Sequence, residues 1–430
     1  MIQEFNHIEK LNGELSLPGD KSISHRAVIF SAMADGVSEI SNLSDGEDVN
    51  STINCLEAIG TEIERVGRSA KVRGRGFKNF KKPSSPLNAG NSGTTARLIS
   101  GLLAPQNFNS VIIGDDSLSK RPMDRVIHPL KLMGANIEST GNGTLPIKIF
   151  PPEKLMPIDY SLPVASAQVK SAVLIAALHC DVISSVTDKY QTRDHTERML
   201  NLKTSFLSGP GGKEKVIYSS KENYPRPSSY LVPSDISTAS FFIVLTLLLK
   251  NSELKLADVS LNETRIGILK VLKQMGGDIE IQNEKESNGE SFGDIIVRSS
   301  KLKNIGIKNE IIPNIIDEIP ILSVAGLFAD GTFQIQNAKE LRKKESDRIK
   351  SLCYNYRLLG LIIDESPDGF TISGEIKNHL PIFESFDDHR IAMAFSVLSM
   401  LLKEGAKMNK FDCVSISNPN FISQLKKIVR

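Results

Sequence analysis

Six stretches of the 430-residue sequence repeat one design, and this repetition limits the possible folds more than any other feature. Each begins with a polar or glycine-containing lead and continues as a mainly apolar segment, and successive starts lie roughly 70 residues apart. A helix that is apolar on nearly all sides belongs in the interior of a domain. The six stretches are DKSISHRAVIFSAMA (20–34), GNSGTTARLISGLLA (90–104), ASAQVKSAVLIAALH (165–179), PSDISTASFFIVLTLLL (233–249), IDEIPILSVAGLFA (316–329) and DDHRIAMAFSVLSMLL (387–402).

A second pattern recurs between these stretches. LEAIGTEI, LKLMGANI, LKQMGGDI and YRLLGLII each end an amphipathic helix in glycine and continue as a strand. Gly60, Gly134, Gly276 and Gly360 fit the left-handed position that follows a helix, which glycine adopts at low cost. Short alternating segments such as SVIIGD and LPIKIF supply further strands. Each repeat is therefore predicted to combine strands with one buried and one outer helix.

Six such repeats exceed one compact core, so we expect two α/β domains of three repeats each. The proline- and serine-rich stretch YPRPSSYLVPSD (224–235) falls between the third and fourth repeats and is the expected crossing point. Four scattered cysteines without a CxxC pair predict reduced thiols and a cytoplasmic protein rather than a disulfide framework or a metal site. The longest apolar run, FFIVLTLLL, is too short to span a bilayer.

Basic residues recur at helix starts although the chain's net charge is only +2. Because a helix N-terminus carries about half a positive charge, it favours anions rather than more cations. Repeated basic leads with glycine-rich turns therefore predict a local site for a small polyanion, whereas the balanced charge argues against a general nucleic-acid or membrane binder. The basic residues are Lys21 and Arg26, Arg97, Lys120 and Arg121 before an expected helix start at Pro122, the mutually repelling Lys344 and Arg348, and Arg390.

Carboxylates stand among these cations. Asp317 and Glu318 open the fifth buried stretch, and Glu345 lies between Lys344 and Arg348. An acid in the first turn of a helix is commonly a partner of the helix dipole, which is an equally good interpretation of Glu318. Asp317 and Glu345 are better candidates for proton transfer, because surrounding cations keep a carboxylate ionised.

Seven motifs, in order and spacing from Leu17 to about Met400, closely resemble the 5-enolpyruvylshikimate-3-phosphate synthases, which are enolpyruvyl transferases. They are LPGDKSISHRA, GNSGTTARL, KRPM, ASAQVKSA, IDEIPIL, LRKKESDRI and DDHRIAMAF. The resemblance implies an α/β (α+β) fold of six βαβαββ repeats, three per domain, with helix N-termini facing a cleft between the domains. The first domain would comprise residues 1–19 and 236–430, and the second residues 20–235.

The resemblance also implies a reaction. The carboxyvinyl group of phosphoenolpyruvate passes to the 5-hydroxyl of shikimate 3-phosphate, through a tetrahedral intermediate and with release of phosphate, in the shikimate pathway to aromatic amino acids. No metal or organic cofactor is implied, nor a nucleic-acid or membrane partner, and we expect a monomer. The alternatives are a UDP-N-acetylglucosamine enolpyruvyl transferase, whose Lys-Asn lead and loop cysteine are absent here, and a non-enzymatic repeat scaffold that binds an anionic partner.

Site residues are carried over motif by motif as implications of the resemblance. The resemblance implies that Asp317, Glu345 and Lys21 are the catalytic residues. Shikimate 3-phosphate would contact Lys21, Ser22, Arg26, Ser166, Ala167, Gln168, Arg193, Asp317 and Lys344. Phosphoenolpyruvate would contact Lys21, Gly93, Arg121, Gln168, Arg348 and Arg390. Gly93 further implies that glyphosate, a mimic of phosphoenolpyruvate, binds. Ala167 replaces a serine of one branch of the family, and Arg193 compensates for the missing hydroxyl. The C-terminal SISNPNFISQL lacks a lysine that some members use.

Overall fold

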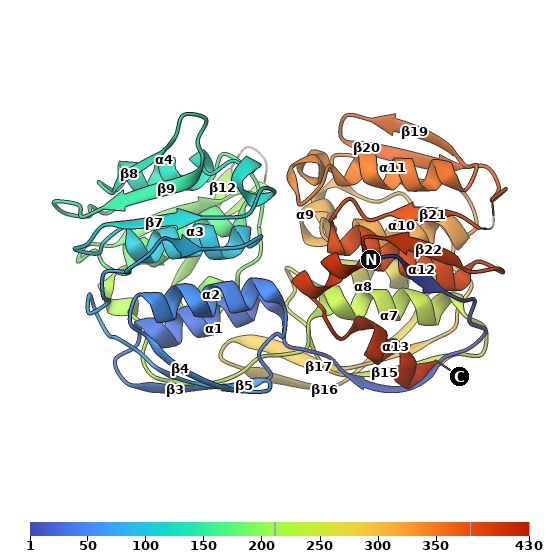
Figure 1. The fold of residues 1–430 in the computed structure, drawn as a ribbon, viewed down its shortest axis with the longest axis horizontal. Coiled ribbons are helices and arrows are strands. Elements are labelled where there is room, and N and C mark those ends of the chain that lie inside the picture. The colour runs from blue at the N-terminus through green and yellow to red at the C-terminus, as the bar shows by residue number, and fades with distance from the viewer. Residues whose placement is uncertain (210–211, 379, 430) are drawn as a thin grey trace. The chain divides into compact units, whose positions relative to one another are not determined.

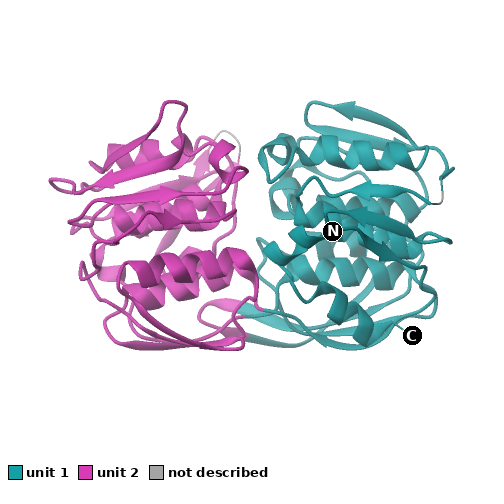
Figure 2. Ribbon diagram, in the orientation of Figure 1, with its two compact units in different colours: residues 1–18, 233–285, 291–430 teal, residues 19–232, 286–290 magenta. Residues whose placement is uncertain are grey.

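The computed structural model describes residues 1–209, 212–378 and 380–429 (Figure 1). The chain divides into two compact units, one of residues 1–18, 233–285 and 291–430 (unit 1) and one of residues 19–232 and 286–290 (unit 2) (Figure 2). Thus residues 233–235, expected in the second domain, belong to unit 1. The tip of one hairpin, residues 286–290, belongs to unit 2, which the sequence did not predict.

The described residues of unit 2 form three sheets, each with four strands. In two of these sheets the parallel pair comes first in the chain and a hairpin follows, which pairs antiparallel through its second strand, as in the order β6-β7-β9-β8. The sheet with the order β14-β3-β5-β4 has the same pairing, but its parallel strand β14 comes last in the chain. The strands are β3 (Val37–Ser41), β4 (Glu62–Val66), β5 (Ser69–Arg73), β6 (Leu87–Asn88), β7 (Ser110–Ile113), β8 (Asn136–Thr140), β9 (Thr144–Phe150), β10 (Asp159–Ser161), β11 (Ser184–Asp188), β12 (Thr204–Gly209), β13 (Gly212–Ser219) and β14 (Ser229–Leu231). The helices are α1 (Lys21–Met33), α2 (Glu47–Ala58), α3 (Gly93–Leu103), α4 (Asp124–Leu132), α5 (Ala167–Ala177) and α6 (His195–Met199).

Unit 1 contains one four-stranded and two three-stranded sheets among its described residues. The strands are β1 (Gln3–Phe5), β2 (Asn12–Ser16), β15 (Glu253–Ser260), β16 (Asp278–Ser287), β17 (Glu290–Arg298), β18 (Phe333–Ile335), β19 (Ile362–Ser366), β20 (Gly369–Ser373), β21 (Ile382–Glu384) and β22 (Ala406–Asn409). The helices are α7 (Ile236–Leu248), α8 (Gly267–Gln274), α9 (Ile312–Ile315), α10 (Ile319–Phe328), α11 (Arg348–Leu358), α12 (His389–Leu401) and α13 (Phe421–Ile428).

The first strand of one repeat in each unit comes from a distant part of the chain. β2 pairs parallel with β15, which places the N-terminal segment beside the C-terminal half as the resemblance implied. β14 pairs parallel with β3, so the proline-rich crossing stretch contributes a strand to unit 2 before the chain leaves it. Each pairing completes the four-stranded sheet of its repeat, which confirms the repeat architecture.

The buried helices and the glycines after the outer helices are as predicted. Every residue of α1 from Ile23, of α7 up to Leu247 and of α12 up to Met400 is buried. Gly60, Gly134, Gly276 and Gly360 have φ values of 97°, 89°, 100° and 79°. Because these values lie in the left-handed region, glycine is needed to reverse the chain there.

The structure also bears on the expectations about membrane spans and cysteines. Among the described residues, no single helix is long and apolar enough to cross a membrane. One pair bent by 115°, Asn309–Ile315 with Ile319–Phe328, passes by length and composition, although most of α10 is buried. The four cysteines are free thiols.

Candidate active site

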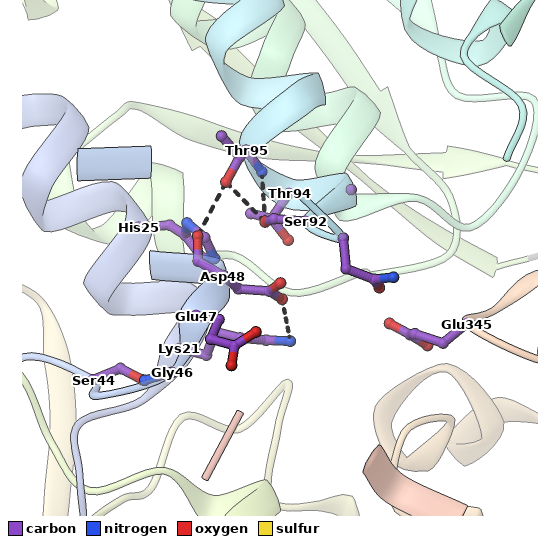
Figure 3. Close-up of polar contacts among 12 residues, drawn as sticks. Lys21, His25, Ser44, Gly46, Glu47, Asp48, Ser92, Thr94, Thr95 and Glu345 are labelled. Carbon is purple, nitrogen blue, oxygen red and sulfur yellow. Dashed lines mark hydrogen bonds and ion pairs between the residues drawn. The ribbon is translucent and has the colours of Figure 1, made fainter. Parts of the chain in front are cut away.

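The N-terminus of α1 carries two of the predicted site cations. Asp20 caps the helix, because its side chain accepts a hydrogen bond of 3.0 Å from the backbone N–H of Ile23. The Lys21 Nζ atom lies 2.9 Å from Oδ2 of Asp48, which stands in the first turn of α2 (Figure 3). The lysine at a positive helix end is thus partly compensated by a carboxylate of a neighbouring helix.

A buried chain of hydroxyls supports this end of α1. The Nδ1 atom of His25 lies 2.7 Å from Oγ1 of Thr52, whose Oγ1 lies 2.7 Å from that of Thr95. Thr95 in turn donates to Ser92, the N-cap of α3 (Figure 3). Burial and the positive charges of Lys21 and Arg26 hold the pKa of His25 well below its usual value. The imidazole is therefore neutral, and it links α1, α2 and α3 without adding charge.

Arg26 is a buried cation that is held by neutral groups. Its Nε atom donates to Thr196 Oγ1 at 2.8 Å, Nη1 to the Ser22 carbonyl at 2.8 Å, and Nη2 to Ser171 Oγ at 2.7 Å. The pKa of Arg26 is lowered to about 10, mainly by burial and also by the positive charge of Arg193. The negative charges of Glu197, Glu290 and Asp20 act in the opposite direction. Arg26 and Arg193 are thus close enough to repel, as expected of two groups that bind one anion.

Behind Arg26, α5 and α6 are joined by a fully buried ion-pair cluster. The Lys170 Nζ atom lies 2.8 Å from Asp188 Oδ2 and 2.7 Å from Glu197 Oε1. Burial alone would lower the pKa of Lys170, but the charges of Glu197 and Asp188 outweigh it and raise that pKa. Lys170 therefore remains charged and ties α6 to α5. Ser166, the N-cap of α5, accepts from the Val169 N–H at 3.4 Å, and Ala167 is the first residue of that helix.

A second group of predicted residues surrounds the start of α3. Arg97 donates to Oε1 of Gln168 at 2.6 Å, and Gln168 donates to Thr94 Oγ1 at 2.8 Å. A Cβ atom added at Gly93 would lie 2.7 Å from Arg97 Nη1 and 3.7 Å from Arg121 Nη1. Arg121 itself donates to the carbonyl and side-chain oxygens of Asn91. Gly93, Arg121 and Gln168 are thus neighbours, and Arg97 connects them.

In unit 1, the predicted catalytic residue Asp317 lies among three of the predicted substrate-binding cations. Its Oδ1 atom lies 3.1 Å from Lys344 Nζ and 3.1 Å from Arg348 Nη1. Its Oδ2 atom lies 4.0 Å from Arg390 Nη2, and Arg390 also donates to the Asp317 carbonyl at 3.0 Å. One carboxylate that lies immediately before α10 therefore meets three cations from three other segments.

Arg348 is enclosed by carboxylates. In addition to Asp317, its Nη2 atom lies 2.6 Å from Glu345 Oε2, and its Nε atom lies 2.8 Å from Oδ2 of Asp388, the N-cap of α12. Burial alone would raise the pKa of Asp388, but the charge and hydrogen bonds of Arg348 hold it below its usual value. Burial alone would lower the pKa of Arg348, but the charges of Asp388, Glu345 and Asp317 outweigh it and raise that pKa far above its usual value. This group therefore stays charged in the interior.

Glu318 has a different role from that of a helix-dipole partner. It is the N-cap residue of α10 but makes no capping hydrogen bond with its side chain. Its Oε1 atom instead accepts from Ser237 Oγ and lies 3.4 Å from Arg390 Nη1. Arg265 also donates to Ser237 Oγ, at 2.7 Å. Glu318 therefore connects Arg390 to the start of α7.

Two expectations about local structure are wrong. Helix α4 begins at Asp124 rather than at Pro122, and Lys120 ends the 3₁₀ turn Leu118–Lys120. Lys344 and Arg348 do not share a helix, since α11 begins at Arg348 behind its N-cap Asp347. The predicted repulsion between Lys344 and Arg348 is accordingly replaced by shared attraction to Asp317.

Sequence reasoning missed several residues that hold the predicted ones in place: Thr196, Lys170, Asp188, Glu197, Arg265 and Ser237. One signal was present, because Lys170 interrupts the apolar stretch of α5 and a buried lysine requires a carboxylate. Its partners could not be found in the same way, since they lie on other segments. Arg97 was noted as a cation, but its bond to Gln168 was not foreseen.

Comparisons with known proteins agree with these observations. A family model described as EPSP synthase (3-phosphoshikimate 1-carboxyvinyltransferase) matches residues 5–425. The 3-phosphoshikimate 1-carboxyvinyltransferase of Petrotoga mobilis is 46% identical over 430 residues, which is 99% of this chain and 99% of that protein. The protein of the same name from Oceanobacillus iheyensis is 43% identical over 421 residues, covering 98% of this chain and 97% of its own length.

Solved structures give the same result. EPSP synthase from Acinetobacter baumannii superposes with a TM-score of 0.85 at 37% identity, covering all of this chain and 98% of that one. The enolpyruvyl transferase NikO from Streptomyces tendae has a TM-score of 0.77 at 15% identity, covering 99% and 97%, which shows a shared fold. The match of residues 5–425 to the family model, with relatives above 40% identity, shows that this protein belongs to the EPSP synthase family.

Proposed function

We propose that this protein is a 3-phosphoshikimate 1-carboxyvinyltransferase, which transfers the carboxyvinyl group of phosphoenolpyruvate to the 5-hydroxyl of shikimate 3-phosphate and releases phosphate. Membership of the family supports this activity. The structural observation that carries it is the position of Asp317 among Lys344, Arg348 and Arg390. A protein that only binds anions gains nothing from a carboxylate there, whereas a proton-transfer enzyme requires one.

We propose that unit 2 supplies most of the shikimate 3-phosphate site. Arg26 and Arg193 are two adjacent cations, and Arg26 would take the substrate carboxylate. Ser166 accepts a hydrogen bond as the N-cap of α5, so its hydroxyl proton is available for a phosphate oxygen. The proposed contacts are Lys21, Ser22, Arg26, Ser166, Ala167, Gln168 and Arg193, with Asp317 and Lys344 from unit 1.

Phosphoenolpyruvate would be held by Lys21, Gly93, Arg121, Gln168, Arg348 and Arg390. Arg348 already has three carboxylate partners, and a substrate anion beside them would be repelled, so we expect it to take the place of at least one of them. The Asp388 side chain is fully buried, whereas those of Asp317 and Glu345 are 10% and 18% exposed. We therefore expect Asp388 to keep its bonds to Arg348 while Glu345 turns away to make room.

The proposed chemistry follows from these charges. As the 5-hydroxyl oxygen attacks C2 of phosphoenolpyruvate, Asp317 accepts the hydroxyl proton and C3 gains a proton, which gives a tetrahedral ketal. The ketal then loses phosphate, and C3 returns a proton to restore the vinyl group. Glu345 and Lys21 are the partners for proton delivery to C3 and to the leaving phosphate. Fixed cations stabilise both anions, and holding the reactants together supplies several kcal/mol more.

The activity is tested by measuring phosphate release from the purified protein. We expect release when shikimate 3-phosphate and phosphoenolpyruvate are both present, and none when either is omitted. Release with UDP-N-acetylglucosamine in place of shikimate 3-phosphate would instead support the sister activity. If no phosphate were released with either acceptor, the remaining interpretation would be a non-enzymatic scaffold that binds an anionic partner. We also propose that the active species is a cytoplasmic monomer without a metal or organic cofactor, and light scattering on the active preparation measures its mass.

A further inference from the structure

A hairpin that is rooted in unit 1 ends in unit 2. Its strands β16 and β17 pair within the sheet that contains β15, but residues 286–290 at its tip belong to unit 2. Asn288 Nδ2 at the tip donates to Ser228 Oγ at 3.2 Å, and the Gly289 carbonyl accepts from Arg198 Nη1 at 3.4 Å. The tip is therefore attached to unit 2 by specific polar contacts.

Gly289 allows this attachment. Its φ is +77°, and a Cβ atom added there would lie 2.7 Å from the Arg198 carbonyl oxygen. A side chain at this position would therefore push the tip away from α6, because a backbone oxygen cannot be moved cheaply. The hairpin tip and α6 therefore meet backbone against backbone, at a point where glycine is required.

The next residue, Glu290, enters the interior of unit 2. Its Oε1 atom lies 2.8 Å from Nδ1 of His195, and the two side chains are 1% and 0% exposed. His195 is the first residue of α6. A carboxylate from the hairpin thus holds the start of a helix that belongs to the proposed shikimate 3-phosphate site.

Three successive residues of α6 are tied to other segments, namely to β17, α1 and α5. His195 binds Glu290, Thr196 accepts from Arg26 and donates to Ser171 at 2.8 Å, and Glu197 pairs with Lys170. A helix of five residues has too few internal hydrogen bonds to be stable by itself. Its position is consequently set by these side chains, and so are the positions of Thr196 and of the adjacent Arg193.

The electrostatic coupling agrees with this geometry. Burial lowers the pKa of Arg26 to about 10, while the charges of Glu197 and Glu290 raise it. Glu290 is therefore close enough to act on the guanidinium that is proposed to hold the substrate carboxylate. Its negative charge, at the tip of the β16–β17 hairpin, helps to compensate a cationic site in unit 2.

We propose that Glu290 is a positioning residue for shikimate 3-phosphate. Its bond to His195 fixes α6, and α6 in turn holds Arg26 through Thr196 and positions the neighbouring Arg193, the two cations proposed to bind this substrate. This inference rests on the proposed function, because it concerns the same site. Glu290 itself would touch neither substrate. Its effect should therefore appear in the binding of shikimate 3-phosphate rather than in that of phosphoenolpyruvate.

The test compares full-length variants by titration with shikimate 3-phosphate alone and by steady-state kinetics. Glu290→Gln should raise the Kd for shikimate 3-phosphate about tenfold, as expected when a hydrogen bond to a charged group is weakened, and leave the KM for phosphoenolpyruvate nearly unchanged. Gly289→Ala should raise the same Kd by displacing the tip. Glu286→Gln, on an exposed residue of the same tip, should leave both constants unchanged.

His195→Asn is the conservative variant. The asparagine amide offers a donor close to the position of Nδ1, so the Kd for shikimate 3-phosphate should stay near that of the wild type. An unchanged Kd in both Glu290→Gln and Gly289→Ala would overturn the proposal. So would equal changes in the KM values of both substrates together with a lower melting temperature, since these indicate a purely structural role. If the wild type itself fails to bind shikimate 3-phosphate, the proposed function has failed instead.

Discussion

The Oδ1 atom of Asp317 lies 3.1 Å from the Nη1 atom of Arg348, and the same oxygen lies 3.1 Å from Lys344 Nζ. The proposed base is therefore ionised and held in place before any substrate arrives. Its partners are also the cations that are proposed to bind substrate anions. Ligand binding would then draw Lys344 and Arg348 toward substrate oxygens, which makes Asp317 a stronger base at the moment when a base is needed.

Replacing Asp317 by Asn should nearly abolish turnover while shikimate 3-phosphate still binds. Asparagine preserves the size of the side chain and can accept a hydrogen bond, but it cannot take a proton from the 5-hydroxyl. We expect a loss of about 10²–10⁴-fold in kcat, the usual contribution of a general base. Phosphate release measures kcat, and a titration with shikimate 3-phosphate alone measures binding.

A matched control is Asp387→Asn, which removes a carboxylate from an exposed position near the start of α12. This variant should retain turnover close to that of the wild type. If Asp317→Asn turned over at the wild-type rate, Asp317 would have no part in proton transfer.

Gly93→Ala should weaken glyphosate and phosphoenolpyruvate binding through Arg97. The added methyl group would lie 2.7 Å from Arg97 Nη1, so the guanidinium must move. This movement disturbs its hydrogen bond of 2.6 Å to Gln168 and leaves Gln168 with its hydrogen bond to Thr94. Inhibition by glyphosate and the KM for phosphoenolpyruvate report this change. The inhibition constant should rise at least about tenfold, as expected for the disturbance of a charged hydrogen bond.

Gly141→Ala is the control for this substitution, because a Cβ atom there meets nothing within 4 Å. Both constants should keep their wild-type values in this variant. An unchanged glyphosate constant in Gly93→Ala would remove Gly93 from the phosphoenolpyruvate site. A change that also appears in the affinity for shikimate 3-phosphate would show that Gln168 serves both substrates.

The repeat architecture could be predicted because it depends on local signals. Apolar stretches such as 236–247 are buried on all sides, and glycines such as Gly360 occupy the left-handed position after a helix. Both features follow from a few neighbouring residues. The location of cations at the starts of α1, α3 and α12 was accessible for the same reason.

The pairings between segments could not be predicted from residue spacing. Glu290 lies 95 residues from His195, and Arg26 lies 170 residues from Thr196. Lys344 and Arg348 were expected to repel on one helix, but the turn before α11 separates them and Asp317 binds both. Such contacts depend on the tertiary fold rather than on local sequence, so local rules gave the wrong sign for this pair.

Asp388→Asn should destabilise the protein near neutral pH but not in acid. The Asp388 carboxylate is fully buried against Arg348, which is 1% exposed, so the variant leaves a buried cation with less compensation. Loss of one partner of a buried pair costs about 3–5 kcal/mol of unfolding free energy. Denaturant unfolding at about pH 7, compared with the wild type, measures this loss.

The pH dependence of that difference follows from the pKa of Asp388, which Arg348 holds below its usual value of 3.8 against the effect of burial. A carboxyl group with a lowered pKa stabilises the folded state above its unfolded pKa, and this stability is lost as the pH falls through the folded pKa. The wild type and Asp388→Asn should therefore converge as the pH falls below 3.8 and through the lowered pKa of the folded state. A difference that stays constant over this range would contradict the assignment of Asp388 as the ionised partner.

Lys170→Met should destabilise unit 2, because it leaves the carboxylates of Asp188 and Glu197 buried without their cation. We expect a loss of about 3–5 kcal/mol in unfolding free energy. Neutralising one acid as well, in Lys170→Met/Glu197→Gln, should recover part of this loss, because an uncharged amide is cheaper to bury than a carboxylate. A double-mutant cycle that includes Glu197→Gln alone gives the coupling energy of the pair. Strictly additive effects would show that Lys170 and Glu197 do not interact, and the attachment of α6 to α5 would then depend on Thr196 and Ser171.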